Sequence, residues 1–122
     1  MAPELRRFIL TSIPSVPYLE AVLLLRAEAG RGWSAADVAR RLYLPEQQAA
    51  DLLENLQGAG LTRADPDGAA RYAPSTDELA SMIAALAARY TVDVVGVSDL
   101  IHSRGERKAQ QFADAFLWKK DS

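Results

Sequence analysis

The sequence contains no cysteine among its 122 residues, which excludes disulfide bonds and metal sites built on thiolates. Long hydrophobic runs are missing as well. In the N-terminal segment MAPELRRFILTSIPSVP the longest apolar stretch is Phe8-Ile9-Leu10, too short for the apolar region of a signal peptide. No run approaches the roughly 18 apolar residues of a membrane-spanning helix. We therefore expect a cytoplasmic protein without a membrane partner.

An excess of positive charge is also absent, because the formal net charge is −2. Nucleic-acid-binding domains are often basic, so the total charge gives no support to such a function. Hydrophobic residues make up 49% of the chain and charged residues 25%, which is an ordinary globular balance. The length suggests one domain, or one small domain with appended helices, that buries a core without staples.

The sequence has little that points to catalysis. It contains neither a glycine-rich phosphate loop nor a G-x-S-x-G motif. His102 is the only histidine, and it has no cysteine or second histidine with which to bind a metal. Asp93 and Asp99 are six residues apart and do not share a helical face, so they do not form a pair of catalytic carboxylates. We expect neither an enzyme nor a bound cofactor.

Apolar spacing and capping residues predict four helices in the first half of the chain. Ser15-Val16-Pro17 begins the strongest, and its apolar residues cover most of its circumference, which predicts a buried helix. Ser34 and Asp37 form the pattern of a capping box, and that helix should end near Tyr43-Leu44. The other two are predicted from Leu5, Phe8 and Ile9 before Ser15, and from Ala49, Leu52, Leu53 and Leu56 after Pro45.

A β-hairpin is predicted next, with strands at 61–64 and 69–73 around the turn Asp65-Pro66-Asp67-Gly68. Thr76 then caps another helix, whose first turn carries Asp77 and Glu78. Its apolar stripe continues through residues that are poor helix formers, so a kink or a strand over 91–103 stays open, although the spacing favours helix. The stripe consists of Leu79, Ile83, Leu86, Tyr90, Val94, Val97 and Ile101, and a last helix is marked by Ala109, Phe112, Ala113 and Phe116.

The segment LLENLQGAGLTRADPDGAARYAP, residues 52–74, resembles the end of a winged helix-turn-helix domain, similar to those of bacterial MarR-like regulators. Its pattern L-x-x-L-x-x-x-G-L places two leucines on the inner helix face, ends the helix with Gly60 and starts the wing with Leu61. The resemblance implies a mainly α fold with a small β-hairpin. Residues 1–74 would form the winged helix-turn-helix domain with an N-terminal helix. Residues 75–122 would form a C-terminal helical extension for dimerisation, packed on the same domain.

In winged-helix DNA binders the third helix enters the major groove and the wing touches the backbone. The resemblance therefore assigns base contacts to Gln47 and Gln48. Phosphate contacts would come from Arg40, Arg41, Arg63 and Arg71. Against this, the exposed face of the third helix carries Asp51 and Glu54, whose charge repels phosphate, and no Lys or Arg. The simpler reading is a solvated helix face with ordinary surface arginines that pair with Asp65 or Asp67.

The long apolar stripe has two readings. MarR-like proteins pair through terminal helices, which makes the stripe from Leu79 to Ile101, together with Phe112 and Phe116, a candidate dimer seam. The alternative is that these side chains pack within their own domain.

Two functions follow from these patterns. The first is a homodimeric winged-helix protein that binds duplex DNA and regulates transcription. The second is a winged-helix module for protein–protein interaction whose acidic third helix repels DNA and presents Asp51 and Glu54 to a basic partner.

Overall fold

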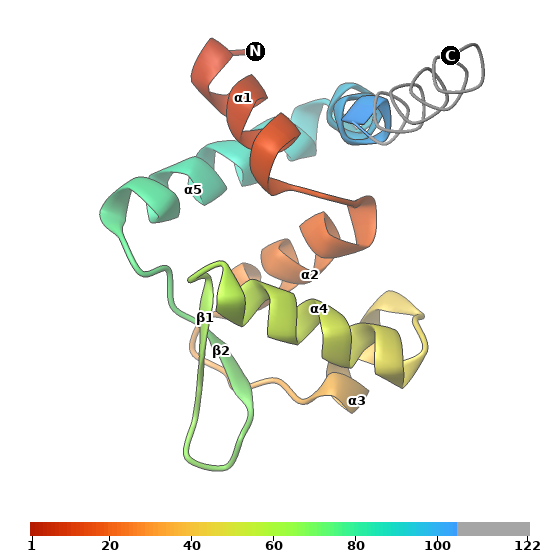
Figure 1. Cartoon of the computed structure of the whole chain (residues 1–122), viewed down its shortest axis with the longest axis vertical. Helices are drawn as coiled ribbons and strands as arrows, with labels where there is room; N and C mark the ends of the chain where they lie inside the picture. The colour runs from red at the N-terminus through yellow and green to blue at the C-terminus, as the bar shows by residue number, and fades with distance from the viewer. Residues whose placement is uncertain (105–122) are drawn as a thin grey trace, which may run out of the picture.

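The computed structural model describes residues 1–104 and is mainly helical with one small antiparallel sheet, as predicted. The elements are α1 (Pro3–Ser12), α2 (Val16–Ala27), α3 (Ala35–Leu42), α4 (Glu46–Gly58), β1 (Thr62–Ala64), β2 (Ala70–Tyr72) and α5 (Asp77–Val92), followed by the helix Val94–Arg104. Helices α1 and α5 lie at one end of the molecule, α2 and α4 in the middle, and α3 and the hairpin at the other end (Figure 1). Phe112 and Phe116 lie outside the described residues.

Side-chain caps fix the helix starts where the sequence predicts them. The Ser15 hydroxyl accepts a hydrogen bond from the Tyr18 backbone N–H at 3.2 Å. Ser34 and Asp37 each bond the other's backbone N–H, which completes the predicted capping box. Pro45 precedes α4 as its capping residue and provides no side-chain hydrogen bond to it.

The hairpin is joined to the loop before α3. Strands β1 and β2 pair with Arg63 opposite Arg71, and Gly68 adopts a φ of +89° in the turn, a conformation that favours glycine. Trp33 and Ala70 exchange two backbone hydrogen bonds of 2.7 and 2.8 Å. The indole of Trp33 is completely buried, so this loop and the hairpin form one packed unit with α2 and α4.

One hydrophobic core extends from Leu5 in α1 to Ile101 near the end of the described chain. Helix α2 is buried on most of its circumference and packs against α3, α4 and β2, as its sequence predicts. Residues on both sides of the predicted domain boundary at 74 and 75 contribute to this core. Within the described residues, the segment after 75 is therefore part of the same packed body.

The stripe that begins in α5 is helical on both sides of a sharp bend, which confirms the predicted helix together with the kink left open over 91–103. The break occurs at Asp93, whose carboxylate accepts a hydrogen bond from the Gly96 backbone N–H at 3.0 Å and from Arg89 at 2.8 Å. These hydrogen bonds, first that from Gly96 and then that from Arg89, hold the pKa of Asp93 below its usual value. Asp93 thus ends one helix and caps the next.

This arrangement corrects the expectation of a continuous dimer seam. Ile83, Leu86, Val97 and Ile101 are buried in the core of their own chain and are not exposed to a second copy. Leu79 and Tyr90 are partly buried against the same core, and Val94 alone of the stripe is half exposed. Helical spacing had identified an apolar face correctly, but the rest of the same chain covers it.

No single helix within residues 1–104 is long and apolar enough to cross a membrane. Two pairs of consecutive helices reach the length and composition of a membrane span only when each pair is counted as one segment. These pairs are α1 with α2, bent by 111°, and α5 with the helix Val94–Arg104, bent by 118°.

Candidate functional site

A groove of about 460 Å³ lies between α4, the beginning of α3 and the hairpin, and none of the six residues predicted to contact DNA lines it. We call it the α4–hairpin groove. Its lining is mostly small and apolar, because five alanines contribute to it. The lining residues are Trp33, Ser34, Ala35, Ala50, Leu53, Glu54, Gln57, Ala64, Asp67, Gly68, Ala69 and Ala70. Leu53, predicted to point into the core, is partly buried, packs against the core and also lines this groove.

The charges of the α4–hairpin groove are negative. Glu54 projects from α4 and Asp67 from the hairpin turn, and among the described residues that line the groove none is basic. Helix α4 adds Glu46 and Asp51 and has no Lys or Arg anywhere in its length. A phosphate backbone placed along this helix would therefore meet carboxylates of its own sign without a compensating cation on α4.

The two glutamines predicted to read bases are both exposed on α4. The Gln47 side-chain amide donates a hydrogen bond to the Asp51 carboxylate at 3.1 Å. This contact is an ordinary i, i+4 interaction on a helix surface, and it holds the glutamine amide beside a negative charge. Gln48 has no side-chain hydrogen bond within residues 1–104, so it is the freer of the two.

Two of the predicted phosphate-binding arginines pair with acids of the same region. Arg40 contacts Asp37 within α3, and Arg41 lies 3.4 Å from the Glu28 carboxylate. Hydrogen bonds with Ser34, and to a smaller degree Arg31, hold the pKa of Asp37 below its usual value. Because Arg40 and Arg41 are largely exposed, these ion pairs are weak and leave the guanidinium groups open to other partners.

Arg71 is different, because it is a structural residue. Its guanidinium makes hydrogen bonds of 3.1 to 3.3 Å to both carboxylate oxygens of Asp65 and donates another to the Gly30 carbonyl oxygen. The hydrogen bonds from Arg71 hold the pKa of Asp65 below its usual value, and Asp65 raises that of Arg71. Arg71 therefore joins the hairpin to the loop before α3, and its contact with phosphate stays a prediction.

Arg63, another of the predicted phosphate ligands, also has an exposed side chain. It lies opposite Arg71 in the sheet and has no ion pair within the described part of the chain. Of the four arginines predicted as phosphate ligands, the structure thus leaves Arg40, Arg41 and Arg63 exposed, while Arg71 is bound internally.

Sequence reasoning did not single out Tyr43, which the structure places at the turn between α3 and α4. Its side chain is 94% exposed, and its backbone is left-handed with a φ of 57°. Left-handed residues that end helices are usually Gly or Asn, because a larger side chain costs stability in this conformation. Tyr43 lies between the predicted end of the capped helix and Pro45. This position indicates a turn, from which the exposure of the side chain was predictable.

Trp33 is a second residue that sequence reasoning missed. The Arg31 guanidinium lies 3.8 Å from the centroid of its ring, and that of Arg41 lies 5.3 Å away, so two cations stabilise this buried ring. Ala70, with which Trp33 pairs through the backbone, is distant in sequence, and no local sequence pattern predicts this pairing.

Comparisons of this chain with protein-family models, with curated proteins and with solved structures find no match. We therefore infer the function from the geometry and charges described above.

Proposed function

We infer that this chain is a winged-helix protein-interaction module that binds a positively charged segment of a partner protein in the α4–hairpin groove. The order of elements supports the winged-helix part. Helix α2, the short strand pairing at Trp33, helices α3 and α4, and the hairpin follow one another in the order that winged-helix domains use.

The observation that carries the proposal is the charge of the groove. Glu54 and Asp67 line it from two different elements, Asp51 lies on the same exposed side of α4 as Glu54, and no basic side chain of the described residues lines it. In a DNA-binding winged helix the corresponding surface carries the cations that neutralise phosphate. Here the groove between α4 and the hairpin is complementary to lysine and arginine, whereas the exposed Arg40, Arg41 and Arg63 are not part of its lining.

The shape of the groove indicates how such a partner binds. Alanines at positions 35, 50, 64, 69 and 70 make much of the groove lining small and apolar. The methylene stem of a lysine or arginine can lie on such a surface while its charged end reaches a carboxylate. A guanidinium group bonds a carboxylate with two parallel hydrogen bonds, so we expect arginine to be preferred at Glu54 and Asp67.

The test is a titration of the full chain with a fluorescent arginine nonapeptide at low salt. The double variant Glu54→Lys and Asp67→Lys should weaken binding by at least about tenfold, because each reversal replaces attraction by repulsion. A control variant with the same change in net charge is Glu20→Lys with Asp99→Lys, two exposed acids that do not line the groove. Equal losses in both double variants would show that the peptide reads only total charge.

Duplex DNA is the second candidate ligand, with the chain acting as a homodimeric transcriptional regulator. It is favoured by the exposed Arg40 and Arg63 and by the exposed Gln47 and Gln48 on α4. If DNA is the ligand, Arg40→Ala with Arg63→Ala should weaken binding to every duplex sequence and flatten its salt dependence. Absence of binding to a short duplex at low salt removes this candidate.

A further inference from the structure

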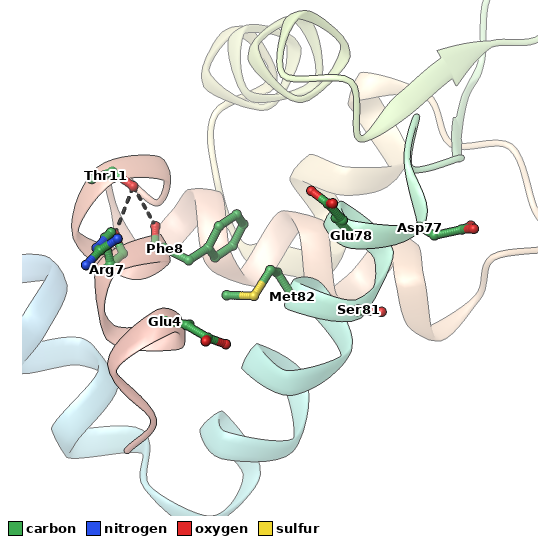
Figure 2. A pocket seen from close by; sticks show the side chains of 8 residues that line it. All are labelled: Glu4, Arg7, Phe8, Thr11, Asp77, Glu78, Ser81 and Met82. Atoms are coloured by element: carbon green, nitrogen blue, oxygen red, sulfur yellow. Dashed lines mark hydrogen bonds between the residues drawn. The ribbon is translucent and has the colours of Figure 1, made fainter.

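A second groove, of about 630 Å³, lies between α1 and the first half of α5 (Figure 2). We call it the α1–α5 groove. Phe8 and Met82 point toward each other at its centre, one from each helix. Both side chains are only partly buried, although they pack against the core, so an apolar surface remains open to a ligand.

Acidic side chains lie on either side of this apolar centre. Glu4 is on α1, and Asp77 and Glu78 are in the first turn of α5. The dipole of each helix favours acids in its first turn, but it does not explain the exposed ring and thioether between them. Within residues 1–104 none of the three carboxylates forms an ion pair, and Arg7 is the one basic residue in the lining. The groove is therefore complementary to an apolar segment that carries cations at both ends.

The chain itself contains such a segment. In residues 105–122, outside the described part, Lys108, Phe112, Phe116 and Lys120 follow one another at intervals of four. Residues at this interval lie on one face of a helix, and the sequence predicts a helix here. Asp114, the acid between the two phenylalanines, would lie on the opposite face. Amphipathic helices of this kind bind apolar grooves through such anchors.

The segment begins close enough to reach the groove of its own chain. At about 1.5 Å per residue, Met82 lies about 15 Å before the bend at Asp93, and Arg104 lies about 15 Å after it. Because the helix Val94–Arg104 turns back by 118°, the direct distance from Arg104 to Met82 is also only about 15 Å. The chain from Arg104 to Phe112 can extend to about 26 Å, so the connection is long enough.

We propose that residues 105–122 fold back onto the α1–α5 groove of their own chain and cover its apolar centre with Phe112 and Phe116. A tethered segment has an effective concentration on the order of millimolar, so it occupies the groove ahead of the same segment from another molecule. Another protein then reaches this groove only by displacing the segment. The proposal is independent of what the α4–hairpin groove binds.

The order of residues sets the direction of the bound segment. Asp77 begins α5 and is about 20 Å from Arg104, farther away than the centre of the groove. Lys119 and Lys120 follow the phenylalanines, so they meet the two acids at the start of α5. The groove thus gives a place to the C-terminal extension, which the sequence predicts to pack on the same domain.

The first experiment uses the absence of cysteine from the chain. A nitroxide spin label attached at Ser122→Cys reports where the end of the segment lies in the full-length, ¹⁵N-labelled protein. The label should broaden the amide NMR signals of Asp77, Ser81 and Met82. The signals of α3 should keep their intensity, because α3 lies at the other end of the molecule (Figure 1). Sharp amide signals at the start of α5 would overturn the proposal.

A mixture of two proteins distinguishes the same chain from a second copy. Spin-labelled protein without ¹⁵N is mixed with ¹⁵N-labelled wild type that carries no spin label. We expect no broadening in this mixture. In the chain that carries both labels, the broadening should persist unchanged on dilution. Broadening at the start of α5 in the mixture would overturn the proposal and assign the contact to a second copy.

The second experiment exchanges charges in the spin-labelled chain. Lys119→Glu with Lys120→Glu should lower the equilibrium constant for docking, read from the broadening, by about tenfold, because repulsion replaces attraction. Asp77→Lys with Glu78→Lys should have the same effect. All four substitutions together should restore docking, because the signs then match again.

The matched control is Glu20→Lys with Asp51→Lys. These two exposed acids lie on α2 and α4, outside the groove, and their reversal should leave docking unchanged. A combined variant that stays undocked would contradict the proposed contact between the terminal lysines and the start of α5.

Discussion

The two grooves of this molecule share acidic walls but differ in what lies between them. The α4–hairpin groove has alanines between Glu54 and Asp67. The groove between α1 and α5, the α1–α5 groove, has Phe8 and Met82 between Glu4 and Glu78. A surface of small alanine side chains accommodates the thin stem of a lysine or arginine. A surface made by a ring and a thioether offers dispersion contacts to another aromatic side chain. The two grooves therefore carry similar negative charge, but we expect them to bind ligands of different chemistry.

The grooves also differ in how their walls are held. One wall of the α4–hairpin groove is the hairpin of two three-residue strands, which is supported by its pairing with Trp33 and by the Arg71–Asp65 ion pair. The α1–α5 groove is formed by two helices that pack directly against each other. Perturbing the first set of contacts should therefore damage one groove and spare the other.

The largest effect is expected for Trp33→Ala. Removing this completely buried indole should lower the free energy of unfolding by about 3–5 kcal/mol, through lost burial and a remaining cavity. Urea denaturation gives the size of the loss, and amide NMR shifts show its location. Shifts should concentrate at α4 and the hairpin. Equal shifts in α1 and α5 would contradict the view that the two grooves are independently supported.

A smaller effect is expected for Arg71→Met, which removes the link between the hairpin and the loop before α3. Hydrogen exchange of the Ala69 and Asp65 amides should become faster, since both lie in the hairpin turn. Arg63→Met, at the opposite position of the sheet, is the matched control and should leave exchange unchanged.

The same ion pair predicts a pH dependence. The pKa of Asp65 is lowered by Arg71, so the stabilisation from its carboxylate is complete above the ordinary aspartate pKa of about 3.9. It is lost as the pH falls through the lower folded value. The stability gap between wild type and Arg71→Met should therefore be constant near neutral pH and shrink in acid. A gap that grows as the pH falls would contradict this sign.

The smallest effect is expected for Tyr43→Asn, and it has the opposite direction. Asparagine tolerates the left-handed backbone at this position, so the free energy of unfolding should rise by about 0.5–1 kcal/mol. Tyr43→Ala is the control that should gain less, because alanine lacks the short polar side chain with which asparagine can hydrogen-bond the local backbone. Equal midpoints in urea for both variants would show that backbone strain is not relieved here.

The local parts of the fold were predictable from the sequence. The caps at Ser15, Ser34 and Thr76 and the turn at Asp65–Gly68 are each formed within a few residues, so their signals are complete in short windows. The hairpin and the order of helices followed from these signals and from apolar spacing.

The contacts that define the candidate site were not predictable in this way, because they join distant parts of the chain. Arg71 donates to the Gly30 carbonyl across 41 residues, and Trp33 pairs with Ala70. Spacing along α5 identified an apolar face but carried no information on what covers it. The acidic character of α4 was visible in the sequence. Its meaning depended on the groove, to which the hairpin adds another carboxylate at Asp67.

We propose that the α4–hairpin groove binds a basic protein segment and not duplex DNA. The most direct measurement titrates the wild-type chain, in parallel and at the same low salt, with a fluorescent arginine nonapeptide and with a short fluorescent duplex. We expect saturable binding of the peptide and no binding of the duplex. Tighter binding of the duplex, weakened by Arg40→Ala with Arg63→Ala, would contradict it and establish the chain as a DNA-binding protein.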